Sequence, residues 1–200
     1  MIDAWYEEVS HQEPLSQGDL ISQCPTVTWT SYPQKTSQAD IDSLKMSIEY
    51  PQDDLVVMTQ ACDLANEKLS VVVLCSHYAL NDYKASWEEA MKASGQNPTV
   101  KAWESLCSRI RDGFVWSLAF LNSGATSNVS TDVRVVDFSE IRTLPRSFIE
   151  EHLRTGFSPR LRLRPPYREH LSQAFARYFM RVGLPTRVNE VWKSTDARTQ

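Results

Sequence analysis

Two short polar segments carry the side chains best suited to chemistry in this chain. Thr59-Gln60-Ala61-Cys62-Asp63 completes one apolar run, and Cys75-Ser76-His77-Tyr78 completes the next. A thiol, a carboxylate and an imidazole on neighbouring strands could act as a nucleophile, a base and the group that orients the base. The candidate catalytic residues are therefore Thr59, Gln60, Cys62, Asp63 and His77.

The spacing of the two segments argues against a Cys62–His77 pair. If the two apolar runs form an antiparallel hairpin, His77 lies at the far end of the second strand, roughly 20–30 Å from Cys62 at the usual rise of a strand. In the competing interpretation, Gln60 and Asp63 hydrogen-bond a turn while Cys62 packs as a small apolar group. We favour the turn and assign no firm catalytic residue.

A metal site could be built from the same side chains. Zinc accepts thiolate, carboxylate and imidazole ligands, which here would be Cys62, Asp63, Cys75 and His77. The spacing between residues 62 and 75 fits no familiar ligand pattern, however, and His170 falls on the apolar stripe of a helix, where a core role is expected. Walker A, GxGxxG, GxSxG and HExxH sequences are also absent. We therefore expect no metal and no cofactor.

A stripe of arginines is the third feature. Alternation over residues 160–164 predicts a strand with three arginines on one face and two leucines on the other. Guanidinium groups at this spacing could follow a phosphate backbone or an acidic partner. Equally, they could pair with acidic groups elsewhere in the chain. The candidate binding residues are Arg142, Arg160, Arg162, Arg164 and Arg168.

The charge distribution bears on that choice. The chain has 200 residues and a formal net charge of −4, but its charge is uneven. From Glu140 onward there are 12 Lys and Arg against 6 Asp and Glu, whereas the part before it has 9 against 19. A basic last third opposite an acidic first part predicts a nucleic-acid face, or a match inside the molecule or between subunits.

Composition predicts a globular cytoplasmic protein. Hydrophobic residues make up 42% and charged residues 23%, which excludes wholesale disorder. No apolar run approaches the roughly 18 residues of a membrane span, and the acidic N-terminus lacks the apolar segment of a secretion signal. The four cysteines are widely spaced and form no CxxC pair, as expected for free thiols in a reducing compartment.

Hydrophobic periodicity predicts an α+β domain. We expect an N-terminal arm over 1–16, one domain over 17–186 with a helical insertion at about 80–112, and a C-terminal tail over 187–200. Continuous apolar runs predict buried strands at 55–59 and 69–75, which should form a hairpin. An apolar stripe after Pro165 and Pro166 predicts an amphipathic C-terminal helix. Several short strands around an insertion favour a small β-barrel core.

Five segments of the chain follow, in order, the layout of a known family. They are Gly18-Asp19-Leu20-Ile21, Leu55-Val56-Val57-Met58-Thr59-Gln60, Val71-Val72-Val73-Leu74, Val135-Val136-Asp137-Phe138-Ser139-Glu140-Ile141-Arg142-Thr143 and Arg160-Leu161. In this layout the chain resembles the PemK/MazF-like toxins, which are endoribonucleases with an SH3-like barrel. It also resembles uncharacterised bacterial proteins with a [ST]-Q-x-C-D-L signature, here Thr59-Gln60-Ala61-Cys62-Asp63-Leu64. The resemblance implies a small SH3-like barrel.

The chain departs from this family where catalysis would occur. The resemblance places an arginine just before the strand that ends at Thr59, but the stretch from Glu49 to Leu55 is acidic and has no arginine. Phosphodiester cleavage needs cations around the developing charge. The leading hypothesis is therefore a bacterial accessory or adaptor protein of a toxin- or defence-type system. It would bind a partner protein, or nucleic acid through the strand at Arg160–Arg164, and self-association stays open.

The alternative hypothesis is a PemK/MazF-like endoribonuclease toxin in which arginines elsewhere in the chain supply the positive charge. Arg142, Arg160 and Arg162 are the arginines that could replace the missing one. The sequence leans toward a protein that is not an enzyme.

Overall fold

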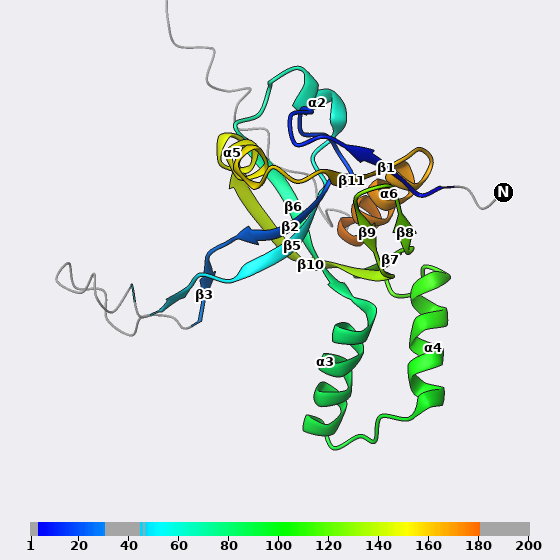
Figure 1. Cartoon of the computed structure of the whole chain (residues 1–200). Helices are drawn as coiled ribbons and strands as arrows, with labels where there is room; N and C mark the ends of the chain where they lie inside the picture. The colour runs from blue at the N-terminus through cyan, green and yellow to red at the C-terminus, as the bar shows by residue number, and fades with distance from the viewer. Residues whose placement is uncertain (1–3, 31–44, 46, 181–200) are drawn as a thin grey trace, which may run out of the picture.

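A five-stranded antiparallel sheet forms the centre of the molecule (Figure 1). The computed structural model describes residues 4–30, 45 and 47–180. The strand order of the sheet is β2-β5-β6-β10-β7. These strands are β2 (Leu20–Pro25), β5 (Gln52–Val57), β6 (Val71–Ala79), β10 (Arg134–Pro145) and β7 (Leu118–Leu121).

The predicted hairpin between the two apolar runs is confirmed. β5 and β6 pair antiparallel, with Leu55 opposite Ser76 and Val57 opposite Leu74. The connection between them contains the short helix α2 (Ala61–Ala65). The β-branched runs form central strands because both faces of the sheet are covered.

Three short two-stranded pairs surround the sheet. β1 (Tyr6–Val9) pairs with β11 (Arg160–Leu163), β3 (Thr28–Trp29) with β4 (Ile48–Glu49), and β8 (Gly124–Ala125) with β9 (Ser130–Thr131). β1 lies in the stretch that the sequence assigns to an N-terminal arm, and its end residues Tyr6 and Val9 are buried. The chain's N-terminal segment is thus joined to a strand more than 150 residues further on.

Two core clusters lie on opposite faces of the central sheet. One joins the sheet to β1, β11 and the helix α6 (Tyr167–Phe179), and includes Val56, Phe138 and Leu171. The other joins it to α2 and the helix α5 (Arg146–Gly156), and includes Leu55 and Ile149. Adjacent residues of β5 contribute to different clusters because side chains alternate along a strand.

The helical insertion leaves the sheet as a separate hairpin. α3 (Leu80–Ala93) and α4 (Val100–Arg111) lie side by side and project away from the sheet (Figure 1). A third, small cluster of Ile110, Leu118 and Val135 anchors the base of this hairpin. Helix α4 begins where the Thr99 side chain accepts a hydrogen bond from the backbone N–H of Ala102.

The C-terminal helix packs on the sheet through a narrower stripe than its sequence predicts. Leu171 is buried, and Tyr167, Phe175 and Tyr178 are half-buried. Phe179 is 56% exposed. His170 is exposed, so the expected core role of this histidine is wrong; α6 is covered on one side, and His170 lies outside that side.

The structure confirms an α+β fold. Within residues 4–30 and 47–180, the hydrogen-bonded order of the central sheet runs from β2 to β7 without closing. The expected tail over 187–200 lies outside the described residues. None of the described helices has the length and apolar character that crossing a bilayer requires.

Candidate functional site

The segment from Thr59 to Asp63 forms the entry to helix α2. The Thr59 hydroxyl accepts a hydrogen bond from the backbone N–H of Val73 at 2.7 Å, and Thr59 is buried. Gln60 occupies the N-cap position of α2 but makes no side-chain capping bond. Asp63 lies 3.9 Å from the Lys68 ammonium group. Thr59 therefore holds two strands together, and the turn contains a helix.

Cys62 and His77 do not form a catalytic pair. Cys62 is exposed on α2, and its sulfur lies 3.7 Å from Gln60 Oε1 and 3.9 Å from Asp63 Oδ1. His77 is buried in the central strand β6, and neither of its ring nitrogens makes a hydrogen bond of normal geometry to a described residue. The expectation that Cys62 packs as a small apolar group is wrong, because α2 turns this side chain to solvent.

The other thiols are poor nucleophiles. Burial raises the pKa of Cys24 to about 11, and Asp53 adds to the shift. Burial likewise raises the pKa of Cys75 to about 12, with Asp137 adding to it. All four cysteines are free. Across the residues with described positions, no three or more His, Cys, Asp or Glu side chains gather as a metal site would require.

Arg160 and Arg162 are internal partners of an acidic residue, which corrects their assignment to a binding face. Asp19 is fully buried, and its carboxylate accepts hydrogen bonds from both guanidinium groups. The remaining donors of Arg160 reach the backbone carbonyls of Ser10, Glu13 and Pro14 at 2.8 to 3.0 Å. Arg160 is only 4% exposed. The two arginines hold the β1–β2 loop in place, and their donors face inward.

The other candidate binding arginines differ in surroundings. Arg142 Nε lies 3.2 Å from Asp53 Oδ2, so the acidic stretch before Thr59 meets an arginine from β10. Arg168 pairs with its neighbour Glu169 at 2.6 Å. Arg164 is exposed. The structure does not gather these groups and Thr59 into one cationic site.

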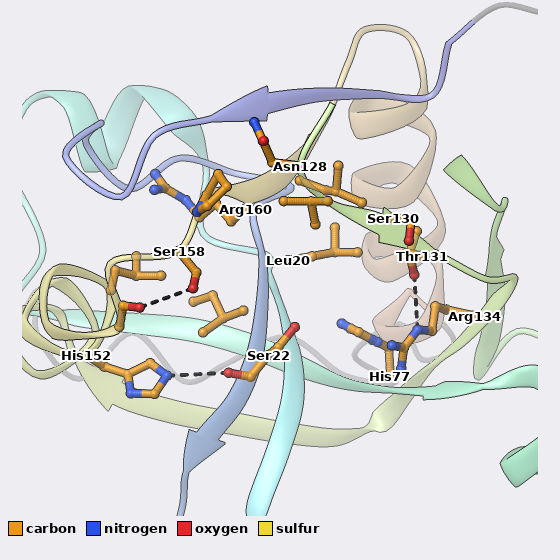
Figure 2. A pocket seen from close by; sticks show the side chains of 16 residues that line it. Leu20, Ser22, His77, Asn128, Ser130, Thr131, Arg134, His152, Ser158 and Arg160 are labelled. Carbon is orange, nitrogen blue, oxygen red and sulfur yellow. Dashed lines mark hydrogen bonds between the residues drawn. The ribbon is translucent and has the colours of Figure 1, made fainter. Parts of the chain in front are cut away.

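A cavity of about 440 Å³ lies against the sheet, next to β11 and the end of α5 (Figure 2). Its polar lining includes His77, Arg134, His152 and several hydroxyl groups, and its apolar wall includes Leu20 and Leu161. His77 lies opposite Val136 in the register of β6 and β10, and Arg134 precedes Val136 by two residues. His77 and Arg134 therefore point to the same face of the sheet.

The imidazole of His77 is neutral in this setting. Burial lowers the pKa of His77 to about 4, and the positive charge of Arg134 adds to the shift. The carboxylate of Asp54 and the backbone of Leu55 oppose it without overcoming it. A neutral imidazole offers one N–H donor and one lone pair; apart from the weak contact with the Leu55 backbone, neither makes a hydrogen bond of normal geometry here to a described residue.

Arg134 and Asp54 form an ion pair beside His77. Arg134 Nη1 lies 2.8 Å from Asp54 Oδ2, and Arg134 Nε donates to the Thr131 hydroxyl at 3.2 Å (Figure 2). A bulge in β2 directs the backbone N–H of Gln23 onto the same carboxylate at 3.0 Å. Burial alone would raise the pKa of Asp54, but the bonds from Gln23 and the charge of Arg134 hold the pKa below its usual value.

The α3–α4 hairpin carries a second surface of interest. The Trp87 and Trp103 rings lie 5.2 Å apart between the helices, and Tyr83 contacts Trp103 at 6.4 Å. All three side chains remain half-exposed, and α3 has no buried residue. Two helices alone leave a strip of aromatic surface uncovered.

The sequence analysis did not single out Arg134 or Asp54. Arg134 interrupts the apolar run Val133–Val136, and Asp54 immediately precedes the run Leu55–Met58. A charge in such a run needs a partner if the strand is buried. This is the signal that could have paired them, although it does not specify which acid meets which arginine.

Comparison with known proteins gives no relative for this chain: no family model, curated protein or solved structure matches it.

Proposed function

We propose that this chain is an accessory protein that binds a partner protein, as an adaptor in a bacterial toxin- or defence-type system. The observation that carries the proposal is the projecting α3–α4 hairpin, whose helix α3 buries no residue (Figure 1). Because α3 buries no residue, the hairpin contributes little hydrophobic stabilisation to the fold, and stability alone does not explain its presence. The half-exposed aromatic strip of Tyr83, Trp87 and Trp103 is the kind of surface that a second protein covers.

The composition of the hairpin favours a protein over a nucleic acid as this partner. Between residues 80 and 112 the chain has five acidic and five basic residues, so the hairpin has no net charge. Nucleic-acid binding relies on an excess of positive charge. Tryptophan and tyrosine, by contrast, are the residues that most often dominate the energy of protein interfaces.

The proposal includes a divergent relationship to the PemK/MazF-like SH3-like barrel. Its support is the order of the segments quoted from the sequence, which fall on β2, β5, β6, β10 and β11. The catalytic part of that resemblance lacks support. The Thr59 hydroxyl is bonded to the backbone of Val73, and Arg142, Arg160 and Arg162 are paired with acidic groups.

The proposal is tested with the product of a gene next to this one. A neighbouring ATPase or defence gene is the partner to express, whereas a small antitoxin gene would favour the endoribonuclease alternative. Binding is measured by calorimetry for the wild type, for Trp87→Ala and for the control Trp29→Ala. Trp29 is 60% exposed in β3, away from the hairpin.

Trp87→Ala should weaken binding at least about tenfold, because aromatic anchors at interface centres contribute most of the affinity. Trp29→Ala should bind as the wild type does. Circular dichroism of both variants checks that α3 and α4 remain helical. Equal affinity of wild type and Trp87→Ala, with helicity intact, would contradict docking through the hairpin.

A further inference from the structure

The cavity beside β11 contains a buried group that the fold leaves unsatisfied. His77 is 3% exposed and lines the cavity, and neither ring nitrogen makes a hydrogen bond of normal geometry to a described residue, although the Leu55 backbone lies close enough to act weakly on the ring. Buried polar groups in folded proteins almost always have a partner, and an exception calls for an explanation. A ligand group within reach of the ring would supply it.

Arg134 provides a charged donor next to this ring. Its Nη1 is bonded to Asp54 and its Nε to Thr131, which leaves Nη2 without a bond to a described protein group. Figure 2 shows the His77 and Arg134 side chains beside one another at one end of the cavity, with His152 at the other end and Ser22 between them. The donors of Arg160, which also lines the cavity, are taken up by Asp19 and the backbone.

The charges on the lining favour a negatively charged ligand. Its ionisable side chains are His77, Arg134, His152 and Arg160, and no carboxylate belongs to the described lining. This is unusual in a chain with a net charge of −4. Asp54 lies behind Arg134 and balances part of its charge, and Asp19 does the same for Arg160.

We propose that this cavity binds a small organic anion, with a carboxylate or phosphate group held between His77 and Arg134. The neutral imidazole donates its N–H, and the guanidinium adds a charge-assisted bond. The volume of about 440 Å³ exceeds what a bare oxyanion fills and lies within the range of small-molecule sites. The rest of the ligand contacts the apolar wall of Leu20, Leu153 and Leu161. This site is independent of the hairpin.

The histidine side chains report on the site in the unaltered protein. The chain has four histidines, so the imidazole nitrogens of all four can be followed by NMR. Benzoate and phenyl phosphate serve as organic probes, inorganic phosphate tests the bare oxyanion, and benzamide is the neutral counterpart of benzoate. Sodium chloride at equal ionic strength is the reference.

We expect saturable shifts of His77 with benzoate or phenyl phosphate. The concentrations needed should be about tenfold below those for benzamide, because the anionic probes accept a charge-assisted hydrogen bond from Arg134 and benzamide does not. The exposed His170, which does not line this cavity, should stay unchanged. A response to inorganic phosphate alone would limit the ligand to a bare oxyanion and contradict the organic part of the proposal. No shift at millimolar probe, or equal shifts with benzamide, would overturn it.

Two double variants separate the site from the fold. Arg134→Gln with Asp54→Asn removes one ion pair of β5 and β10 without changing net charge, and should lower the affinity for benzoate about tenfold or more. Arg142→Gln with Asp53→Asn removes the neighbouring ion pair and should leave the affinity unchanged. Equal effects of the two would contradict the assignment of Arg134.

If the first double variant does not fold, Asp54→Asn alone gives the answer. It keeps an oxygen that can accept the bond from the Gln23 backbone and removes the negative charge behind Arg134. Benzoate should then bind more tightly than in the wild type. Unchanged or weaker binding would count against the proposed anion site.

Discussion

Arg160 Nε donates to Asp19 Oδ2 at 2.8 Å inside the protein, although 141 residues separate the two in the chain. The pair links the residue that precedes β2 to β11. Arg160 also donates to the carbonyls of Ser10 and Pro14, which fixes the loop between β1 and β2. The basic last third of the chain thus meets the acidic first part within one molecule. This relationship decides how the arginine stripe should respond to mutation.

Arg160→Ser should destabilise the protein by about 3–5 kcal/mol, because it leaves Asp19 buried with half of its charge compensation lost. Arg164→Ser, at the exposed residue that follows this strand, should change the free energy of unfolding by less than about 0.5 kcal/mol. Urea unfolding of both variants measures the difference. Equal stability of the two would mean that Arg160 is a surface cation after all.

His77 should make stability depend on pH in a defined window. Its pKa is about 4 in the folded chain and about 6.5 when unfolded, so between these values the unfolded chain binds a proton that the folded chain does not. The contribution is fully present above the unfolded pKa and is lost as the pH falls toward 4, by about 3 kcal/mol in total.

The measurement compares wild type with His77→Gln by urea unfolding at several pH values. The stability of the wild type relative to His77→Gln should decrease as the pH is lowered from roughly 6.5 to 4. Above roughly pH 6.5 it should stay constant. His170→Gln, the same replacement at an exposed histidine, is measured alongside as the control. A constant difference between wild type and His77→Gln would show that the ring has the same pKa in the folded and the unfolded chain.

Thiol labelling should distinguish Cys62 from the other cysteines. Cys62 is exposed, whereas Cys24 and Cys75 are buried and have raised pKa values. A disulfide reagent near neutral pH should therefore react fastest with Cys62, in a phase that Cys62→Ser removes, because the thiolate is the reacting form. The half-exposed Cys107, whose pKa is raised by burial, should react more slowly. Cys24 and Cys75 should react only on unfolding. A fast phase that survives Cys62→Ser would contradict these positions.

The packing of α6 predicts a contrast along one helix. Leu171→Ala should cost about 2–5 kcal/mol, since this side chain is buried against the sheet. Phe179→Ala should cost less than about 1 kcal/mol, because Phe179 is 56% exposed and its ring packs on Phe175 and Tyr178 of the same helix. Thermal unfolding of the two variants provides the comparison. A larger loss for Phe179→Ala would mean that α6 packs through a different face.

The central hairpin and the two helices of the insertion could be predicted from the hydrophobic pattern of their own residues. The apolar runs around Val56 and Val72 predicted the central hairpin because a strand buried on both faces needs continuous apolar residues. The stripes around Trp87 and Trp103 predicted α3 and α4 because helices follow a 3.6-residue period. Each of these hydrophobic patterns is contained within one short stretch of consecutive residues.

Long-range pairing could not be predicted in this way. Alternation over 160–164 indicated that Arg160 and Arg162 share a face, but not that Asp19 lies against it. The candidate cavity depends in the same way on Arg134 and Asp54, which are 80 residues apart. Nothing in the local sequence distinguishes a buried ion pair from a solvated charge, because the difference is made by what the fold brings alongside.

A cleavage assay tests most directly whether this chain acts by binding rather than by catalysis. Labelled single-stranded RNA is incubated with the purified wild type and with Thr59→Ala, and the products are resolved on a denaturing gel. Because the Thr59 hydroxyl is bonded to Val73, and Arg142, Arg160 and Arg162 are paired with carboxylates, both proteins should leave the RNA intact. Cleavage by the wild type that Thr59→Ala abolishes would contradict the adaptor function and establish an endoribonuclease.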